Sequence, residues 1–239
     1  MPAAERSSAS PGAFLGLDSP YSDLARARVV VVPLPYEATV SYAGGTAAGP
    51  EAILAASRQV ELYDRDFADE PALAYGVHTL PPLSFPPGLP PATVQERVTQ
   101  AAAAVAKEHF PLALGGEHSL SPGVFAGLCQ ARPGVMFDIV HLDAHADLRD
   151  SYDATPYSHA CAARRLLENP ACRFLWQLGI RSLASEEAAY IRERPDRIRT
   201  WFIEELRSGT TWREELHRGI QGRPVFLTFD VDCLDPAVV

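Results

Sequence analysis

The sequence predicts an α/β domain built on a mainly parallel β-sheet. Short apolar runs typical of strands alternate along the chain with segments of helical periodicity. The runs do not alternate with polar residues, which is typical of strands buried on both faces of a parallel sheet. With 239 residues, 47% hydrophobic and 21% charged, the chain can form a sizeable core. We therefore expect one domain over residues 1–239, of which residues 1–20 form a flexible tail.

Six segments are predicted as strands. In chain order they are Ala27–Pro35, Pro111–Gly115, Val135–Asp143, Arg173–Ile180, Ile198–Ile203 and Pro224–Asp232. In open α/β sheets, ligand sites form beyond the carboxyl ends of the strands. The chemistry of this protein is therefore expected where these segments end.

Helices are predicted between the strands. The first begins at Gly49-Pro50, where proline is tolerated in the first turn, and runs towards Tyr63. Another is marked by Thr93 and Glu96, which have the spacing of a capping box, and a third by Ser121 as its N-cap. Further helices are expected at Ala160–Glu168, Glu186–Arg194 and Trp212–Arg218.

Composition excludes several classes of protein. The net charge of -9 argues against nucleic-acid binding, and the apolar runs are too short to cross a bilayer. The N-terminus has no basic region followed by an apolar stretch, so no secretory signal is expected. The cysteines show no C-x-x-C spacing, which favours free thiols in the reducing cytoplasm over disulfides. They are Cys129, Cys161, Cys172 and Cys233.

The segment after the third predicted strand carries three potential metal ligands. Asp143, His145 and Asp147 are separated by alanines and would share one side of an extended chain. Such a cluster at the end of a buried strand is costly unless a cation neutralises it. The alternative is a polar loop with N-capping aspartates.

Two other strand ends carry ligand-type residues. Asp230 and Asp232 follow the last predicted strand, and His118 follows Gly115-Gly116. The glycines allow tight turning of the backbone. The alternatives are two solvated loop carboxylates and a structural histidine. Gly-Gly also hints at phosphate binding, but no dinucleotide or Walker pattern accompanies it.

Together the three strand ends offer two histidines and four aspartates. This set is too large for a closed tetrahedral zinc site and suits two metal ions bridged by carboxylates. Its many oxygen atoms favour a hard ion such as manganese over zinc or copper. Such a pair can share a hydroxide, because coordination lowers the pKa of water.

These motifs resemble the ureohydrolase family, which includes arginase and agmatinase. The resemblance spans roughly residues 27 to 236 and implies a three-layer arginase-like fold. It rests on the segments 33–50, Gly115–Ser119, Asp143–Asp147 and Thr228–Pro236.

The resemblance implies two Mn2+ ions per subunit. One ion would be held by His118, Asp143, Asp147 and Asp230, and the other by Asp143, His145, Asp230 and Asp232. Their shared hydroxide would attack the guanidinium carbon of the substrate. His159 matches the family histidine that passes a proton to the leaving amine, and its alternative role is that of a helix-start histidine bonded to backbone.

Segment 148–152 looks more like agmatinases than arginases, so agmatine is the expected substrate, with putrescine and urea as products. Guanidinobutyrate, aminopropylagmatine and arginine are alternatives, as is an inactive metal-binding relative. The resemblance also implies a homo-oligomer, either a trimer or a hexamer.

Two departures from the family pattern stand out. Glu117 replaces an aspartate that many members carry, although a carboxylate is retained. The sequence ends at Val239, before the family's glycine- and proline-rich loop with its guanidinium-binding glutamate. On this basis we expect a truncated chain that lacks the C-terminal part of the domain.

Overall fold

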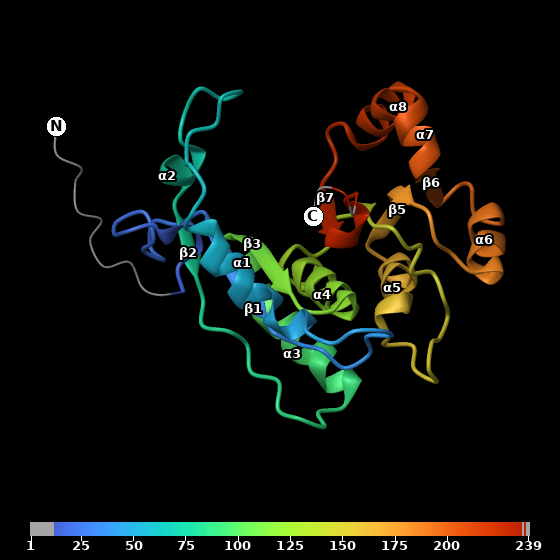
Figure 1. The fold of residues 1–239 in the computed structure, drawn as a ribbon, viewed down its shortest axis with the longest axis horizontal. Helices are drawn as coiled ribbons and strands as arrows, with labels where there is room; N and C mark the ends of the chain where they lie inside the picture. The colour runs from blue at the N-terminus through green and yellow to red at the C-terminus, as the bar shows by residue number, and fades with distance from the viewer. Residues whose placement is uncertain (1–11, 236, 238–239) are drawn as a thin grey trace. The chain divides into compact units, whose positions relative to one another are not determined.

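A computed structural model describes residues 12–235 and residue 237. The chain divides into two compact units, Met1–Glu117 and His118–Val239 (Figure 1). Both combine parallel strands with helices, so the predicted α/β class is confirmed. The prediction of a single domain stays a prediction.

The first unit contains a three-stranded parallel sheet. Its central strand is β1 (Val29–Leu34), which pairs with β2 (Val77–Thr79) on one side and β3 (Phe110–Gly115) on the other. All residues of β1 except Val29 are buried, as the unbroken apolar run predicts. The helices of this unit are η1 (Phe14–Gly16), η2 (Thr46–Ala48), α1 (Gly49–Ser57), α2 (Pro71–Tyr75) and α3 (Pro91–Ala106).

Part of the segment predicted to be a flexible tail, around Leu15 and Leu17, packs within the first unit, and the flexibility of residues 1–20 stays a prediction. Leu17 is buried in a hydrophobic cluster with Val31, Leu54 and Val77. The backbone N–H of Leu15 also donates a hydrogen bond of 2.8 Å to the hydroxyl of Ser57. Residues 1–11 of the predicted tail lie outside the described residues.

The second unit contains a four-stranded parallel sheet in the order β6-β5-β4-β7. The strands are β4 (Phe137–Leu142), β5 (Cys172–Ile180), β6 (Ile198–Phe202) and β7 (Val225–Phe229). Its helices are η3 (His118–Leu120), α4 (Ser121–Ala131), η4 (His159–Cys161), α5 (Ala162–Glu168), α6 (Ser185–Arg192), α7 (Ile203–Ser208), α8 (Thr211–Ile220) and η5 (Val231–Cys233).

Helices cover both faces of this second sheet and give it three layers. One face buries Ile139 and Leu175 against Phe125 of α4 and Leu166 of α5. The other face buries a cluster that contains Trp176 and Trp201, against which side chains of α7 and α8 pack. Adjacent residues of β4 point to opposite faces, so a strand covered on both sides is mostly apolar. Its two polar residues, Asp138 and His141, are themselves buried and have side-chain partners in Arg173 and Asp143.

The six predicted strands all exist. Four of them are one to four residues shorter than predicted, whereas β3 and β5 each begin one residue earlier than predicted. Strand β2 was not predicted, because three residues are too few to give a periodic signal. The short helices α2 and α7 were not predicted either. The helix expected to reach Tyr63 ends at Ser57.

Both predicted N-caps are wrong. Helix α3 begins at Pro91, so Thr93 lies inside its first turn. Ser121 is the first residue of α4, and its hydroxyl lies 2.8 Å from that of Thr228. The Ser121 side chain, which the local sequence predicted to cap a helix, instead contacts a distant residue.

The four cysteines are free, and two of them, Cys161 and Cys172, are buried. Burial raises the pKa of both thiols to about 11, so they remain protonated and unreactive near neutral pH. Among the helices in the described part of the chain, none has the length and apolar character needed to cross a membrane.

Candidate metal centre

The candidate site lies at the carboxyl ends of β4 and β7 in the second unit. These neighbouring strands pair Leu142 with Phe229, so the residues that follow them, Asp143 and Asp230, emerge side by side. The backbone N–H of Asp230 donates to the carbonyl of Leu142 at 2.9 Å and extends the pairing. Parallel pairing therefore brings together two carboxylates that are 87 positions apart in the sequence.

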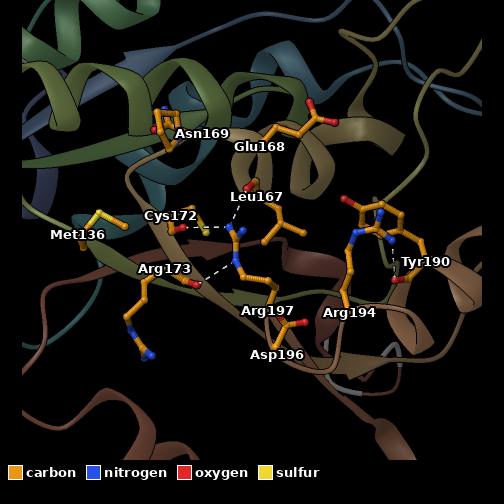
Figure 2. A pocket seen from close by; sticks show the side chains of 11 residues that line it. Met136, Leu167, Glu168, Asn169, Cys172, Arg173, Tyr190, Arg194, Asp196 and Arg197 are labelled. Atoms are coloured by element: carbon orange, nitrogen blue, oxygen red, sulfur yellow. Dashed lines mark hydrogen bonds between the residues drawn. The ribbon is translucent and has the colours of Figure 1, made fainter.

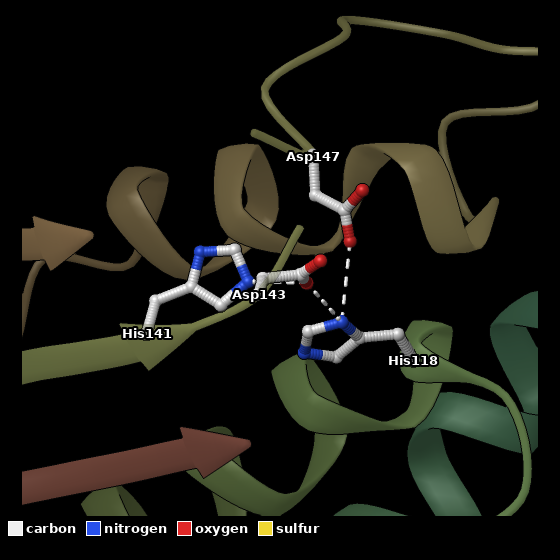
Figure 3. A group of neighbouring side chains, drawn as sticks. All are labelled: His118, His141, Asp143 and Asp147. Carbon is white, nitrogen blue, oxygen red and sulfur yellow. Dashed lines mark hydrogen bonds and ion pairs between the residues drawn. The ribbon is translucent and has the colours of Figure 1, made fainter. Parts of the chain in front are cut away.

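One group of ligand-type atoms surrounds the Nδ1 atom of His118 (Figure 3). This nitrogen lies 3.0 Å from Asp143 Oδ2, 3.2 Å from Asp147 Oδ2 and 3.3 Å from Asp230 Oδ2. The side chains of His118, Asp143 and Asp147 are almost completely buried. The four residues are those that the family resemblance assigns to one metal ion.

A second group shares Asp143 with the first. The Nδ1 atom of His145 lies 3.0 Å from Asp232 Oδ2 and 3.6 Å from Asp143 Oδ1. Asp232 also accepts a hydrogen bond of 3.1 Å from the backbone N–H of Ala144. The structure thus brings all six predicted ligands into two adjoining groups, of which Asp230 belongs to the first, and His145 and Asp232 lie on the more exposed side.

The loop after β4 is not the extended segment that the sequence suggested. Asp147 has a φ of 51°, in the left-handed region, and Asp143 Oδ1 accepts from the backbone N–H of His145 at 2.7 Å. The chain therefore curls, and Asp143 and Asp147 reach His118 while His145 turns towards Asp232.

The loop that carries Asp232 is held by a residue that the sequence did not single out. The guanidinium of Arg181 donates to the backbone carbonyls of Asp232, Cys233 and Leu234. Asp230 also caps η5 by accepting from the backbone N–H of Asp232 at 3.1 Å. These hydrogen bonds fix the positions of the Asp230 and Asp232 carboxylates.

The charged groups of the cluster shift one another's pKa values. Burial favours the neutral form of His118, but the carboxylates of Asp143, Asp147 and Asp230 raise its pKa well above the usual value. Contacts with Asp143 and Asp232 raise the pKa of His145 to about 10. Burial opposes ionisation of Asp143 and Asp230, yet the histidines lower the pKa of both carboxyls.

This donor set fits a divalent cation better than a proton. The Nδ1 of His118 faces three carboxylate oxygens but can carry one proton, and it is a buried atom without a well-directed hydrogen bond. Its Nε2 lies 2.9 Å from the hydroxyl of Thr228, which fixes the ring. A cation would satisfy the lone pair of Nδ1 and the three carboxylates together.

Metal binding should therefore release protons. In the metal-free protein the raised pKa values keep His118 and His145 protonated at pH 7, and a bound cation must displace both protons. We expect the apparent Mn2+ affinity to rise as the pH rises from 6 towards 9. Calorimetric titrations in buffers of different ionisation enthalpy measure the protons released, and a proton count of zero at pH 7 would contradict the raised values.

The same pKa shifts predict how the metal-free protein responds to pH. A raised histidine pKa adds stability that is fully present below the unfolded value of about 6.5. That stability is lost as the pH rises through about 10, the pKa of His145. The melting temperature of the metal-free protein should fall between pH 7 and 10, and a flat profile would be evidence against the predicted ion pairs.

The predicted proton-transfer residue, His159, begins η4, a short helix that contacts η3, where His118 lies. Its ring packs edge-on against Tyr152 with centroids 6.0 Å apart, and its Nδ1 lies 3.4 Å from the hydroxyl of Ser158. His159 therefore lies in an element that neighbours the site, and it does not belong to either group of ligand-type side chains.

The residues just before His118 have structural roles in the first unit. The carboxylate of Glu117 is buried and accepts from the backbone N–H groups of Ala38 and Thr39, both at 2.7 Å. Gly116 lies so close to the backbone of Leu34 and Tyr36 that an added Cβ would be 2.2 Å from the carbonyl oxygen of Tyr36. Close approach, rather than a special backbone angle, explains this glycine.

Sequence reasoning missed His141, which is fully buried beside the cluster (Figure 3). Its Nε2 lies 2.7 Å from Asp143 Oδ2. The available signal was its position two residues before Asp143, which places both side chains on the same face of the strand.

A separate cleft of about 640 Å³ lies at the amino end of the same sheet, lined by residues that include Met136, Cys172 and Arg197 (Figure 2). Arg197 donates to the carbonyls of Leu167, Cys172 and Arg173. Because these bonds occupy the guanidinium, the cleft is a structural junction between α5 and β5 and not the candidate site.

Comparison with known proteins identifies the family. A family model described as the arginase family matches residues 27–239. The chain belongs to the arginase family. This membership confirms the family and the hydrolase class predicted from the motifs.

Among its relatives in the arginase family is an N(1)-aminopropylagmatine ureohydrolase of Synechocystis sp., 37% identical over 216 residues. That match covers 89% of this chain and 69% of the relative. An agmatinase of Bacillus cereus is 32% identical, with 88% of this chain and 69% of the relative covered.

Solved structures of the arginase family share the fold. The agmatine ureohydrolase of Thermoplasma volcanium superposes with a TM-score of 0.78 at 26% identity, covering 95% of this chain and 73% of that one. The proclavaminate amidino hydrolase of Streptomyces clavuligerus reaches 0.82 at 24% identity and covers 98% and 78%. The predicted arginase-like fold is thereby confirmed.

Proposed function

We propose that this arginase-family protein hydrolyses a guanidino compound with two Mn2+ ions, and that its substrate is agmatine, which yields putrescine and urea. The observation that carries the proposal is the convergence of six ligand-type side chains in two adjoining groups, with the Asp143 carboxylate in contact with both groups. The relatives named agmatinase support the substrate.

The first proposed set is the group of side chains around His118, and the second is the group of Asp143, His145 and Asp232 with Asp230 added. One ion would be held by His118, Asp143, Asp147 and Asp230, and the other by Asp143, His145, Asp230 and Asp232. Bound there, paired divalent ions would lower the pKa of a coordinated water and supply the nucleophile for the guanidinium carbon.

The side chains around the cluster serve to hold and orient these groups. Thr228 fixes the ring of His118, and Arg181 holds the loop of Asp232. In this proposal His159, in the neighbouring η4, gives a proton to the departing amine, since an amine leaves only after protonation.

Replacing His159 with alanine should lower kcat by about 100-fold or more, the usual contribution of a positioned acid or base. Mn2+ affinity should remain unchanged, because His159 lies outside the ligand cluster. His217→Ala, at an exposed position of α8, is the matched control and should behave as the unmodified protein. Steady-state kinetics and calorimetry separate the two effects, and an unchanged kcat would remove His159 from the reaction.

A second substrate is favoured by a specific observation. The Synechocystis relative named N(1)-aminopropylagmatine ureohydrolase is 37% identical, against 32% for the agmatinase of Bacillus cereus. N(1)-aminopropylagmatine carries the same guanidinium group on a longer polyamine. The reacting group, and hence the metal chemistry, would be the same.

Urea release in the presence of Mn2+ tests the proposal. Agmatine, N(1)-aminopropylagmatine, guanidinobutyrate and arginine should be compared side by side at equal concentration. The highest kcat/KM with agmatine supports the proposal, and the highest with the aminopropyl compound selects the second candidate. Bound manganese without turnover of any of them would mean that the chain is a metal-binding protein without this activity.

The cellular location and the oligomeric state are also part of this proposal. We propose a cytoplasmic homo-oligomer, a trimer or a hexamer, that binds neither nucleic acid nor membrane. Sedimentation of the manganese-loaded protein distinguishes these states from a monomer.

A further inference from the structure

A row of buried polar side chains crosses the sheet of the second unit beside the metal centre. Strand register pairs His141 of β4 with Thr228 of β7 on one side and with Gln177 of β5 on the other, and Gln177 pairs in turn with Thr200 of β6. All four side chains are buried, and His141 and Gln177 are 0% exposed. Polar groups at such positions require partners, because leaving them unpaired is costly.

Hydrogen bonds in this row fix the orientation of the Gln177 amide. The hydroxyl of Thr200 donates to Gln177 Oε1 at 2.9 Å, and Gln177 Nε2 donates to the carbonyl of Ala146 at 2.7 Å. The Ala146 carbonyl can only accept, so the amide nitrogen must face it. The second N–H of the same nitrogen then points to His141 Nδ1, 3.0 Å away.

The fixed amide determines the tautomer of His141. Because Nδ1 accepts from Gln177, it carries no proton, and the ring proton lies on Nε2. Nε2 is 2.7 Å from Asp143 Oδ2, so it donates a hydrogen bond to that carboxylate. Although His141 lies within reach of a cation shared with His118, Asp143 and Asp147, neither of its nitrogens has a lone pair to offer.

We propose that His141 is a positioning residue of the metal centre, which the relay from Thr200 through Gln177 sets as a donor to Asp143. The inference rests on the proposed metal site. It matters because Asp143 is the carboxylate that both groups of ligands share. A donor on Oδ2 holds the plane of that carboxylate, which keeps Oδ2 towards His118 and Oδ1 towards His145.

The other end of the row acts in the same way on a second ligand. Thr228, the register partner of His141, lies 2.9 Å from His118 Nε2, so its hydroxyl orients the histidine whose Nδ1 faces the carboxylates. One row of the sheet therefore orients two of the six ligands, Asp143 and His118. Neighbouring strands bring these groups together, and no single motif contains them.

Mn2+ titration of the metal-free protein tests the role of His141. His141→Phe keeps a planar ring of similar size but removes the donor, and it should weaken Mn2+ binding by about 10–100-fold, the usual effect of losing such a partner. His141→Gln places an amide N–H near the position of Nε2 and should recover most of the affinity. The electron paramagnetic resonance signal of the coupled manganese pair should weaken in the first variant and return in the second.

Two further variants keep the test decisive. His109→Phe makes the same change in the first unit, where the histidine Nδ1 donates to the carbonyl of Ala27 at 2.9 Å, and it should leave Mn2+ affinity unchanged. Gln177→Met removes the tautomer control but keeps His141, so it should weaken binding less than His141→Phe. It also replaces His141→Phe as the test if that variant does not fold.

The outcomes separate this inference from the proposed function. Affinity and spectrum unchanged in His141→Phe, with only a lower melting temperature, would make His141 a structural residue and overturn the inference. If the unmodified protein binds two ions but releases no urea, the proposed function fails and the role of His141 stands. An unmodified protein that binds no Mn2+ would overturn the metal centre and this inference with it.

Discussion

Replacing Asp143 with asparagine is expected to abolish binding of the Mn2+ pair and turnover together. Asp143 Oδ2 lies 3.0 Å from His118 Nδ1 and Asp143 Oδ1 lies 3.6 Å from His145 Nδ1, so this carboxylate contacts both groups of ligand-type side chains. The asparagine side chain has the same shape but offers one neutral oxygen, which binds a hard cation poorly. The loss of affinity should exceed the roughly 100-fold that residues supporting a ligand can cost.

Asp150→Asn is the matched control for this experiment. It makes the same substitution seven positions away, on a side chain that is 76% exposed and pairs with Arg164 and Arg165 at the surface. Exposed pairs of this kind contribute little. Both variants should be compared by calorimetric Mn2+ titration and urea release, and retained activity in Asp143→Asn would mean that the site assignment is wrong.

Gly116→Ala is expected to destabilise the first unit severely. The added methyl group would lie 2.2 Å from the carbonyl oxygen of Tyr36 and 2.8 Å from both Leu34 O and Tyr36 N. These are backbone atoms, which cannot swing aside as a side chain could. We expect a loss of about 3 kcal/mol or more in the free energy of unfolding, at the upper end of the range for overpacking.

Gly209→Ala shows what the same substitution does without a clash. Gly209 has an extended φ of 179°, and a Cβ added there would meet nothing within 4 Å. The variant should be neutral or slightly more stable, because alanine restricts the unfolded chain more than glycine does. Denaturant unfolding measures both variants, and equal stability of the two would show that the backbone at Gly116 can move.

The sequence by itself determined the fold class and the six candidate ligands. Apolar runs such as Val29–Val32 predict buried parallel strands, because a strand covered on both faces has no solvent side on which to place polar residues. Ligand-type residues directly after such runs predict a site, since parallel strands bring their carboxyl ends to one edge of the sheet. The motif order then identified the family.

Local sequence was a poorer guide to helix ends. Ser121 looks like an N-cap, yet its hydroxyl lies against Thr228, and α3 begins two residues before the predicted cap at Thr93. Capping is worth about 1 kcal/mol, so a tertiary contact readily takes its place. The three-residue strand β2 gave no periodic signal, and pairing with β1 alone defines it.

Only the tertiary structure decided how the ligands are held. His141, Gln177 and Thr200 lie on three different strands, and register places them in one row beside Asp143. The left-handed backbone conformation at Asp147 and the hydrogen bonds from Arg181 to the loop of Asp232 likewise depend on contacts between distant segments. The sequence names the ligands because their chemistry is local, but their supports depend on strand pairing, which is fixed only when the sheet forms.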